Sequence, residues 1–198
     1  VAYIAADANL KPSKHWDAWY AFLTEQHGLS KKPGFIGMSR GGEYAYTWAT
    51  SHPDKVSCIY ADNTGANPGA LAGLGDLARN DVPVLQICGS IDPLLGRNAL
   101  AIESIYQQFG GRISMIIKDG FGHHPHSLVD PKPIADFVTQ SALANQTKAP
   151  AFVGSRFTRT CYYSTASSYR EFPRDNAFAI CRGPLFTSWY DRYTFGLA

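Results

Sequence analysis

The sequence predicts an α/β protein: helices flank a mostly parallel sheet of about five strands, and a β-rich, aromatic extension follows at the C-terminal end. Short apolar runs alternate with longer amphipathic segments over residues 1–146, as in parallel strands joined by crossover helices. Residues 151–198 differ in composition, because they hold no Lys but 12 of the chain's 26 aromatic residues. At 198 residues the chain can bury roughly 70% of the surface that its unfolded form exposes.

The expected strands are short apolar runs bounded by Gly, Pro, Asn or Asp. Their length and their enrichment in Val and Ile are typical of strands buried on both faces. Such strands place ligand-binding residues just after their carboxyl ends. The expected strands are Val1–Ala5, Gly34–Met38, Val56–Ala61, Val82–Cys88 and Ile113–Ile117.

Amphipathic segments between these runs predict helices. The first covers His15–Gly28, where aromatic residues recur at helical spacing and Gly28 is placed to end the helix. The segment Asn63–Gly75 is rich in Gly, Asn and Pro and is therefore expected to be a loop, with a short helix after Pro68 as the alternative. The remaining expected helices are Gly41–Ser51, Arg97–Phe109 and Pro133–Ala144.

The change in composition predicts three parts: a core over 1–146, a linker over 147–150 and a separate, incomplete β-rich module over 151–198. The expected strands of the module are Cys161–Ser164, Phe178–Cys181 and Tyr190–Phe195. Its aromatic residues suit either sugar stacking or a core that continues beyond Ala198, and the second is favoured. Because the chain starts inside an expected strand, we also expect it to lack an N-terminal part.

Charge and hydropathy exclude two broad functions. The 18 Lys and Arg against 16 Asp and Glu leave a net charge of +2, which is not that of a polybasic nucleic-acid binder. No apolar run approaches the ~20 residues that cross a bilayer. We therefore expect no nucleic-acid partner and no membrane span. We also expect no cofactor.

The cysteines do not settle the compartment. Cys161 and Cys181 could pair in an oxidising one, whereas Cys58 and Cys88 lie in expected buried strands and are interpreted as free thiols. A secreted or periplasmic location is weakly favoured.

The strongest motif lies between an expected strand and an expected helix. Gly37-Met38-Ser39-Arg40-Gly41 matches G-x-S-x-G, which places a serine on a sharp strand-to-helix turn. The two glycines avoid a clash where the arms of the turn meet. The following helix directs free N–H groups and its positive end toward the serine, which favours a negative oxygen there. Ser39 is therefore the candidate nucleophile, although the motif alone is also compatible with an idle turn serine.

A serine hydroxyl needs a base, and the base needs a carboxylate partner. Asp92 is the favoured acid because it follows the strand just before that of the histidines, with Asp62 as the alternative. The favoured base is His123, directly after Gly122. Its alternative is His124, and His126 is the third candidate.

These three histidines also match part of a zinc pattern. A zinc site needs three or four ligands in tetrahedral geometry, and adjacent histidines do not easily face one ion. No second Cys or His cluster accompanies them in the sequence. We therefore expect no metal, and interpret the spare histidines as loop-packing residues.

In these residues and their order, the chain resembles the α/β-hydrolase superfamily over residues 1–144. The resemblance implies a serine hydrolase that forms an acyl-enzyme intermediate, with the backbone N–H of Arg40 as one oxyanion donor. The second donor comes from a loop after an earlier strand in that family, and neither that strand nor the usual His-Gly stretch is present here. Loss of one donor typically costs ~10²–10³ in turnover, so we expect this chain alone to be nearly inactive.

Three hypotheses follow. The leading one is an esterase that cleaves a carboxylic ester of a small molecule or saccharide. The second is a serine peptidase of the same fold, since Ser39-Arg40-Gly41-Gly42 resembles the peptidase form of the turn. The third is a binding module or fragment that is inactive on its own, with the missing remainder of a longer polypeptide as its partner.

Overall fold

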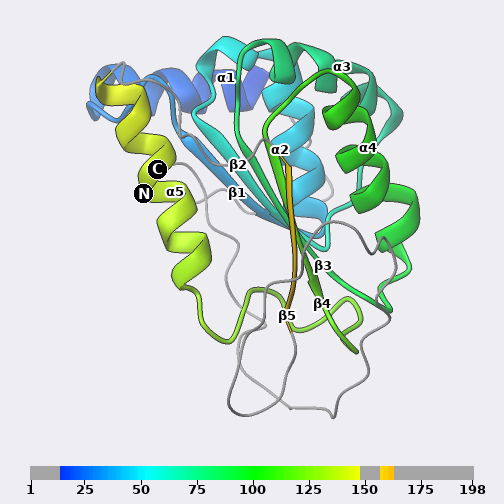
Figure 1. Cartoon of the computed structure of the whole chain (residues 1–198). Coiled ribbons are helices and arrows are strands. Elements are labelled where there is room, and N and C mark those ends of the chain that lie inside the picture. Colours follow the sequence, from blue (N-terminus) through cyan, green and yellow to red (C-terminus); the bar gives the residue numbers. More distant parts are fainter. Residues whose placement is uncertain (1–13, 148–156, 163–198) are drawn as a thin grey trace.

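The fold is a parallel sheet covered by helices, seen in a computed structural model that describes residues 14–147 and 157–162. The described strands lie in the order β1-β2-β3-β4-β5, and each neighbouring pair is parallel (Figure 1). This confirms the expected α/β class and parallel sheet. The strands are β1 (Gly34–Met38), β2 (Cys58–Asp62), β3 (Val84–Gly89), β4 (Ile113–Lys118) and β5 (Phe157–Tyr162).

The register brings the carboxyl ends of the strands to one edge. Met38 at the end of β1 is opposite Asp62 at the end of β2, and Asp62 is opposite Ile87 in β3. Gly89, the last residue of β3, is opposite Lys118 at the end of β4. Residues that follow these strands therefore meet along the same edge, where ligands bind in such sheets.

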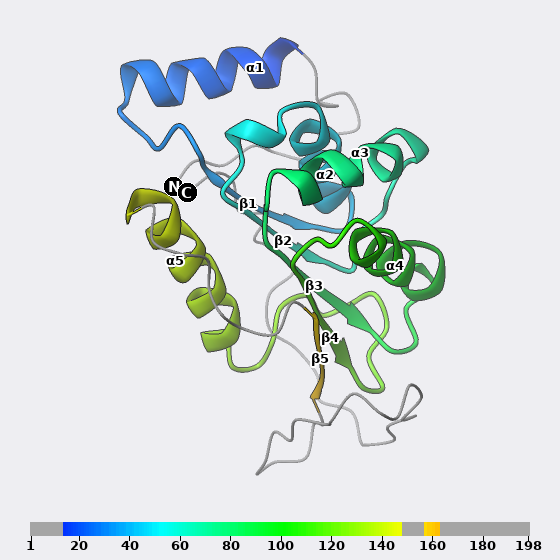
Figure 2. The same ribbon diagram turned by 45° about the horizontal axis from the view of Figure 1, so that its top comes forward.

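Helices cover both faces of the sheet. In Figures 1 and 2, α2, α3 and α4 lie on one face and α5 lies on the other. Each helix contributes to a core that also contains alternate strand residues. The helices are α1 (Lys14–Ala21), which continues as a π-helical turn over Phe22–Gln26, α2 (Arg40–Ser51), α3 (Pro68–Arg79), α4 (Leu100–Gln108), which follows a π-helical turn over Leu95–Ala99, and α5 (Lys132–Thr147).

Of the three apolar cores among the described residues, two contain most of the buried side chains. The larger core joins α2, α3 and α4 to the sheet and contains buried Trp48, Leu74 and Tyr106. The smaller core lies under α5, where Ile134 packs with Tyr60, Ile87 and other strand residues. Because strand side chains alternate between the two faces, both cores draw on the same strands.

Most of the segment Asn63–Gly75 belongs to helix α3, so the favoured prediction of a loop was wrong and the alternative, a helix after Pro68, was right. It spans 12 residues, starts at Pro68 and is capped by Asn67, whose side chain accepts a hydrogen bond from the Ala70 N–H at 2.9 Å. Its glycines lower helix propensity, but burial of Leu74 and Leu77 in the larger core outweighs that cost. The tertiary contact that stabilises the helix was not visible in the local composition.

Residues beyond α5 are described only over β5, which pairs in parallel with β4. Of the strands expected near the two ends, Val1–Ala5, Phe178–Cys181 and Tyr190–Phe195 lie outside the described residues. The division into core, linker and module stays a prediction. No helix among residues 14–147 is long and apolar enough to cross a bilayer.

Candidate active site

Ser39 occupies the sharp turn between β1 and α2. Its backbone has φ 51° and ψ −118°, a conformation that a residue with a side chain rarely adopts. The turn is held because the Ser39 N–H donates to the Asp62 carbonyl at 2.9 Å. A Cβ at Gly37 would lie 2.5 Å from the Gly41 carbonyl oxygen, so this close approach requires glycine. The serine is therefore presented at the sheet edge by a strained but braced turn.

His123 connects Ser39 to Asp92. Its Nε2 lies 2.8 Å from Ser39 Oγ, and its Nδ1 lies 3.0 Å from Asp92 Oδ2. A carboxylate only accepts hydrogen bonds, so the neutral imidazole carries its proton on Nδ1 and leaves Nε2 to accept from the serine hydroxyl. The structure thus brings together the three residues that the sequence favoured as nucleophile, base and acid.

Asp92 is placed by the loop that follows β3. Its side chain is fully buried. Its Oδ1 accepts from the Leu94 N–H at 2.8 Å, and its own N–H donates to the Gly89 carbonyl at 3.2 Å. A Cβ at Gly89 would overlap the carbonyls of Phe121 and Gly122, so glycine lets the acid loop and the histidine loop touch. This contact sets the distance between Asp92 and His123.

Asn63 is a site residue whose role the sequence did not reveal. Its Oδ1 accepts from the Gly89 N–H at 2.8 Å, and its Nδ2 donates to the carbonyls of Gly122, at 3.3 Å, and His123. The side chain is fully buried, and its backbone has φ 45°, which Asn tolerates better than most residues. One side chain thus ties the end of β2 to both loops. The available signal was its place directly after an expected strand.

Asp62, the alternative acid, lies in a different polar cluster. Its Oδ2 accepts from the Tyr60 hydroxyl at 2.9 Å and from the Ser127 N–H, and its Oδ1 lies 3.3 Å from Lys118 Nζ. Lys118 also donates to the Pro125 carbonyl at 2.6 Å. The Asp62 cluster, defined as Asp62, Tyr60, Lys118 and Ser127, therefore anchors the loop that carries the histidines. Lys118 was missed because the expected strand ended at Ile117.

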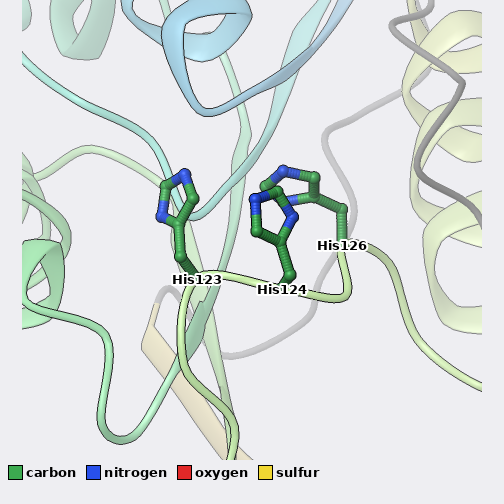
Figure 3. A group of neighbouring side chains, drawn as sticks. All are labelled: His123, His124 and His126. Atoms are coloured by element: carbon green, nitrogen blue, oxygen red, sulfur yellow. The ribbon is translucent and has the colours of Figure 1, made fainter. Parts of the chain in front are cut away.

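The imidazole that contacts Ser39 is that of His123, whereas the alternative base His124 is exposed. The rings of His123, His124 and His126 nevertheless lie together, with centroids 4.7–5.4 Å apart. Figure 3 shows all three rings on the same side of one loop. Adjacent histidines therefore lie close together here, and whether they face one ion stays a prediction.

Arg40 begins α2 directly after Ser39. The backbone N–H groups of a first helical turn have no carbonyl partner within the helix and lie at the positive end of its dipole. The Arg40 N–H therefore lies at the helix end that favours negative charge, beside the serine. Its role as an oxyanion donor stays a prediction.

The buried cysteines are poor competitors for the nucleophile role. Burial, reinforced by the charges of Asp92 and Asp62, raises the pKa of the Cys88 thiol to about 12. Burial also raises the pKa of Cys58 to about 11. Because the thiolate is the reactive form, both thiols are inert at neutral pH. Both are free cysteines, as expected.

Comparison with solved structures gives distant likenesses. No family model and no curated protein matches the chain. A ferulic acid esterase matches with a TM-score of 0.46 and 17% identity over 56% of this chain and 53% of its own. A predicted CIB-like hydrolase from Thermoplasma acidophilum matches with a TM-score of 0.43 and 19% identity over 67% of this chain and 59% of its own. The chain therefore spans less than two thirds of either protein.

Proposed function

We propose that the protein is a serine hydrolase that cleaves a carboxylic ester through an acyl-enzyme intermediate. The observation that carries the proposal is the pair of contacts at His123, 2.8 Å to Ser39 Oγ and 3.0 Å to Asp92 Oδ2. A hydroxyl that contacts an imidazole, which in turn contacts a carboxylate, can act as a nucleophile with its base and the group that orients the base. The strained turn at Ser39 supports the same assignment, since such strain is concentrated at functional sites.

The proposed reaction starts when Ser39 Oγ attacks the carbonyl carbon of the ester and its proton moves to His123 Nε2. Asp92 stabilises the imidazolium that forms. The Arg40 N–H donates to the oxygen that becomes negative. Collapse of this intermediate breaks the bond to the alcohol, which leaves with the proton from His123.

Water completes the cycle in the proposed mechanism. His123 Nε2 takes a proton from a water molecule as its oxygen attacks the acyl carbon of the Ser39 ester. The acid then leaves, and Ser39 Oγ recovers its proton from His123. Both halves use the same groups in reverse roles, so no metal or cofactor is needed for the proton transfers.

The ester is proposed to be linked to a carbohydrate. This part rests on the aromatic and Arg-rich composition of residues 151–198, since aromatic faces can stack on sugars. The second candidate is a serine peptidase of the same fold, which the Ser39-Arg40-Gly41-Gly42 turn favours.

Two measurements test the proposal. A fluorophosphonate probe should label Ser39 in the wild-type chain, if slowly, and not in Ser39→Ala; an unlabelled wild type contradicts the hydrolase proposal for this chain and favours the binding module or inactive fragment. Turnover of p-nitrophenyl acetate and of a peptide anilide then separates the two reactions. Turnover of the anilide alone would overturn the esterase proposal.

A further inference from the structure

Three imidazoles converge beside Ser39. His123, His124 and His126 each offer a ring nitrogen, and these three nitrogens lie within 4.8 Å of one another. Figure 3 shows the three rings rising from one loop. Loop-packing side chains have no need to bring three ring nitrogens to one point, whereas a metal site does.

Two of the imidazoles have a buried carboxylate on their Nδ1 side. His123 Nδ1 lies 3.0 Å from Asp92 Oδ2, and His126 Nδ1 lies 3.8 Å from Asp62 Oδ1. Among the residues that the structure describes, the buried His126 Nδ1 has no hydrogen-bond partner. Histidines that bind a metal through one nitrogen commonly direct the other toward a carboxylate. The bond to Asp92 therefore fixes the His123 ring, with Nε2 as the nitrogen that faces Ser39. The His126 ring makes no such bond, because 3.8 Å exceeds hydrogen-bond distance, so its buried Nδ1 is left as a candidate ligand atom.

We propose that His123, His124 and His126 bind one Zn²⁺ ion, and that the ion blocks the hydrolase by taking His123 Nε2 away from Ser39. Neutral imidazoles suit zinc, whose bonds to histidine nitrogen are about 2.0–2.1 Å long. Three such nitrogens at tetrahedral angles lie closer together than 4.8 Å, so modest rotation of the side chains completes the site. His124 is exposed, so rotation of its ring does not displace side chains of the core.

Zinc and Ser39 compete for the same electron pair. In the described arrangement His123 Nε2 faces Ser39 Oγ at 2.8 Å, ready to accept its proton. A nitrogen whose electron pair is bound to zinc cannot accept that proton. The inhibitory half of the inference therefore rests on the proposed hydrolase function, whereas the binding half does not.

Zinc binding is tested by calorimetry on the full 198-residue chain, with Zn²⁺ as the probe in a buffer without phosphate. We expect one ion per chain, bound at least about tenfold more weakly by His124→Gln and by His126→Gln. The matched control is His27→Gln, because His27 is exposed and its ring lies tilted against Phe22. Binding that is the same in the wild type and in His124→Gln overturns the inference, and the exposed position of His124 keeps that variant folded.

The inhibitory half is tested by the rate at which a fluorophosphonate labels Ser39. Each protein is compared with itself, in excess Zn²⁺ and in EDTA. Zinc should slow labelling at least about tenfold in the wild type and in His27→Gln, and by a smaller factor in His124→Gln. Labelling in EDTA that zinc leaves unchanged overturns the inference, whereas no labelling in EDTA together with intact zinc binding overturns the hydrolase proposal instead.

Discussion

Asp62 and Asp92 have similar positions in the sequence, but their carboxylates face different partners in the fold. Both follow the carboxyl ends of neighbouring strands, and both side chains are fully buried. Asp92 faces the imidazole that contacts Ser39. Asp62 instead faces the Lys118 ammonium, with Tyr60 and Ser127 as further donors.

The difference follows from where each carboxylate leaves the sheet. Asp62 is the last residue of β2, so its side chain shares a face with Tyr60, two residues earlier, in the core under α5. Asp92 lies three residues beyond the end of β3, in a loop that touches the histidine loop. A buried carboxylate at a strand end is thus only a candidate acid until its partner is known.

The largest expected effect separates the two carboxylates by activity. Asp92→Asn should lower turnover by about 10⁴, because the amide favours the wrong tautomer of His123. Asp62→Asn should lower turnover far less in the protein that remains folded. Esterase rates, normalised to the folded fraction from circular dichroism, measure both. A larger loss in Asp62→Asn than in Asp92→Asn would reverse the assignment of the acid.

The next effect concerns stability. Lys118→Met leaves the buried Asp62 carboxylate without its cation and should lower the free energy of unfolding by about 3–5 kcal/mol, measured by urea denaturation. The control is Lys132→Met, because the ion pair of Lys132 with Asp136 is exposed and should contribute much less to stability than the buried pair. Equal losses in the two variants would show that the Asp62 cluster does not stabilise the fold.

A smaller effect on turnover is expected for Asn63, whose side chain joins the end of β2 to the loops of Asp92 and His123. Asn63→Ala removes the bonds to Gly89 and to the His123 carbonyl, so kcat should fall about 10- to 100-fold while KM changes little. Asn67→Ala is the control, since it removes the cap of α3 and a bond to the Thr47 hydroxyl, and should cost about 1 kcal/mol of stability without lowering kcat. A raised KM with unchanged kcat would show that Asn63 contacts substrate instead of positioning the base.

The smallest effect belongs to Cys88, whose Sγ lies 3.9 Å from Asp92 Oδ2. Because a thiol is a weak donor, Cys88→Ala should change turnover by less than about threefold. Burial raises the pKa of this thiol from 9.0 to about 12, so the unfolded chain ionises first as pH rises. The stability that the protonated thiol contributes is present below pH 9 and is lost as pH rises toward 12. Urea denaturation at pH 8 and at pH 10.5 should therefore show a larger loss in the wild type than in Cys88→Ala.

Alkylation of Cys88 tests whether the surroundings of Asp92 are closed to solvent. Iodoacetamide at pH 8 should leave Cys88 unmodified in the folded chain and alkylate it in urea. Rapid alkylation of the folded chain would mean that the pocket around Asp92 is open to solvent.

Much of the site was predictable because its signals are local. The turn at Ser39 follows from G-x-S-x-G between a strand and a helix, and the order of Ser39, Asp92 and His123 follows from the alternation of strands and helices. Asn63 and Lys118 were not predictable, because an amide or an ammonium near a strand end acquires a role only through partners 26 to 60 residues away. The favoured prediction of a loop in place of α3 was wrong for the same reason, and its alternative, a helix after Pro68, was right. The stability of α3 comes from burial of Leu74 and Leu77 and not from its composition.

The sequence by itself determined the α/β class, the strained serine turn and the short set of candidate acids and bases. Periodicity and glycine placement act over a few residues, and that range suffices for these features. Only the tertiary structure placed Asp92 beside His123 and Asp62 beside Lys118, brought His123 to Ser39 and gathered His124 and His126 beside His123. Those outcomes depend on which loops meet at the sheet edge, and the distances between loops are set by packing across the whole core.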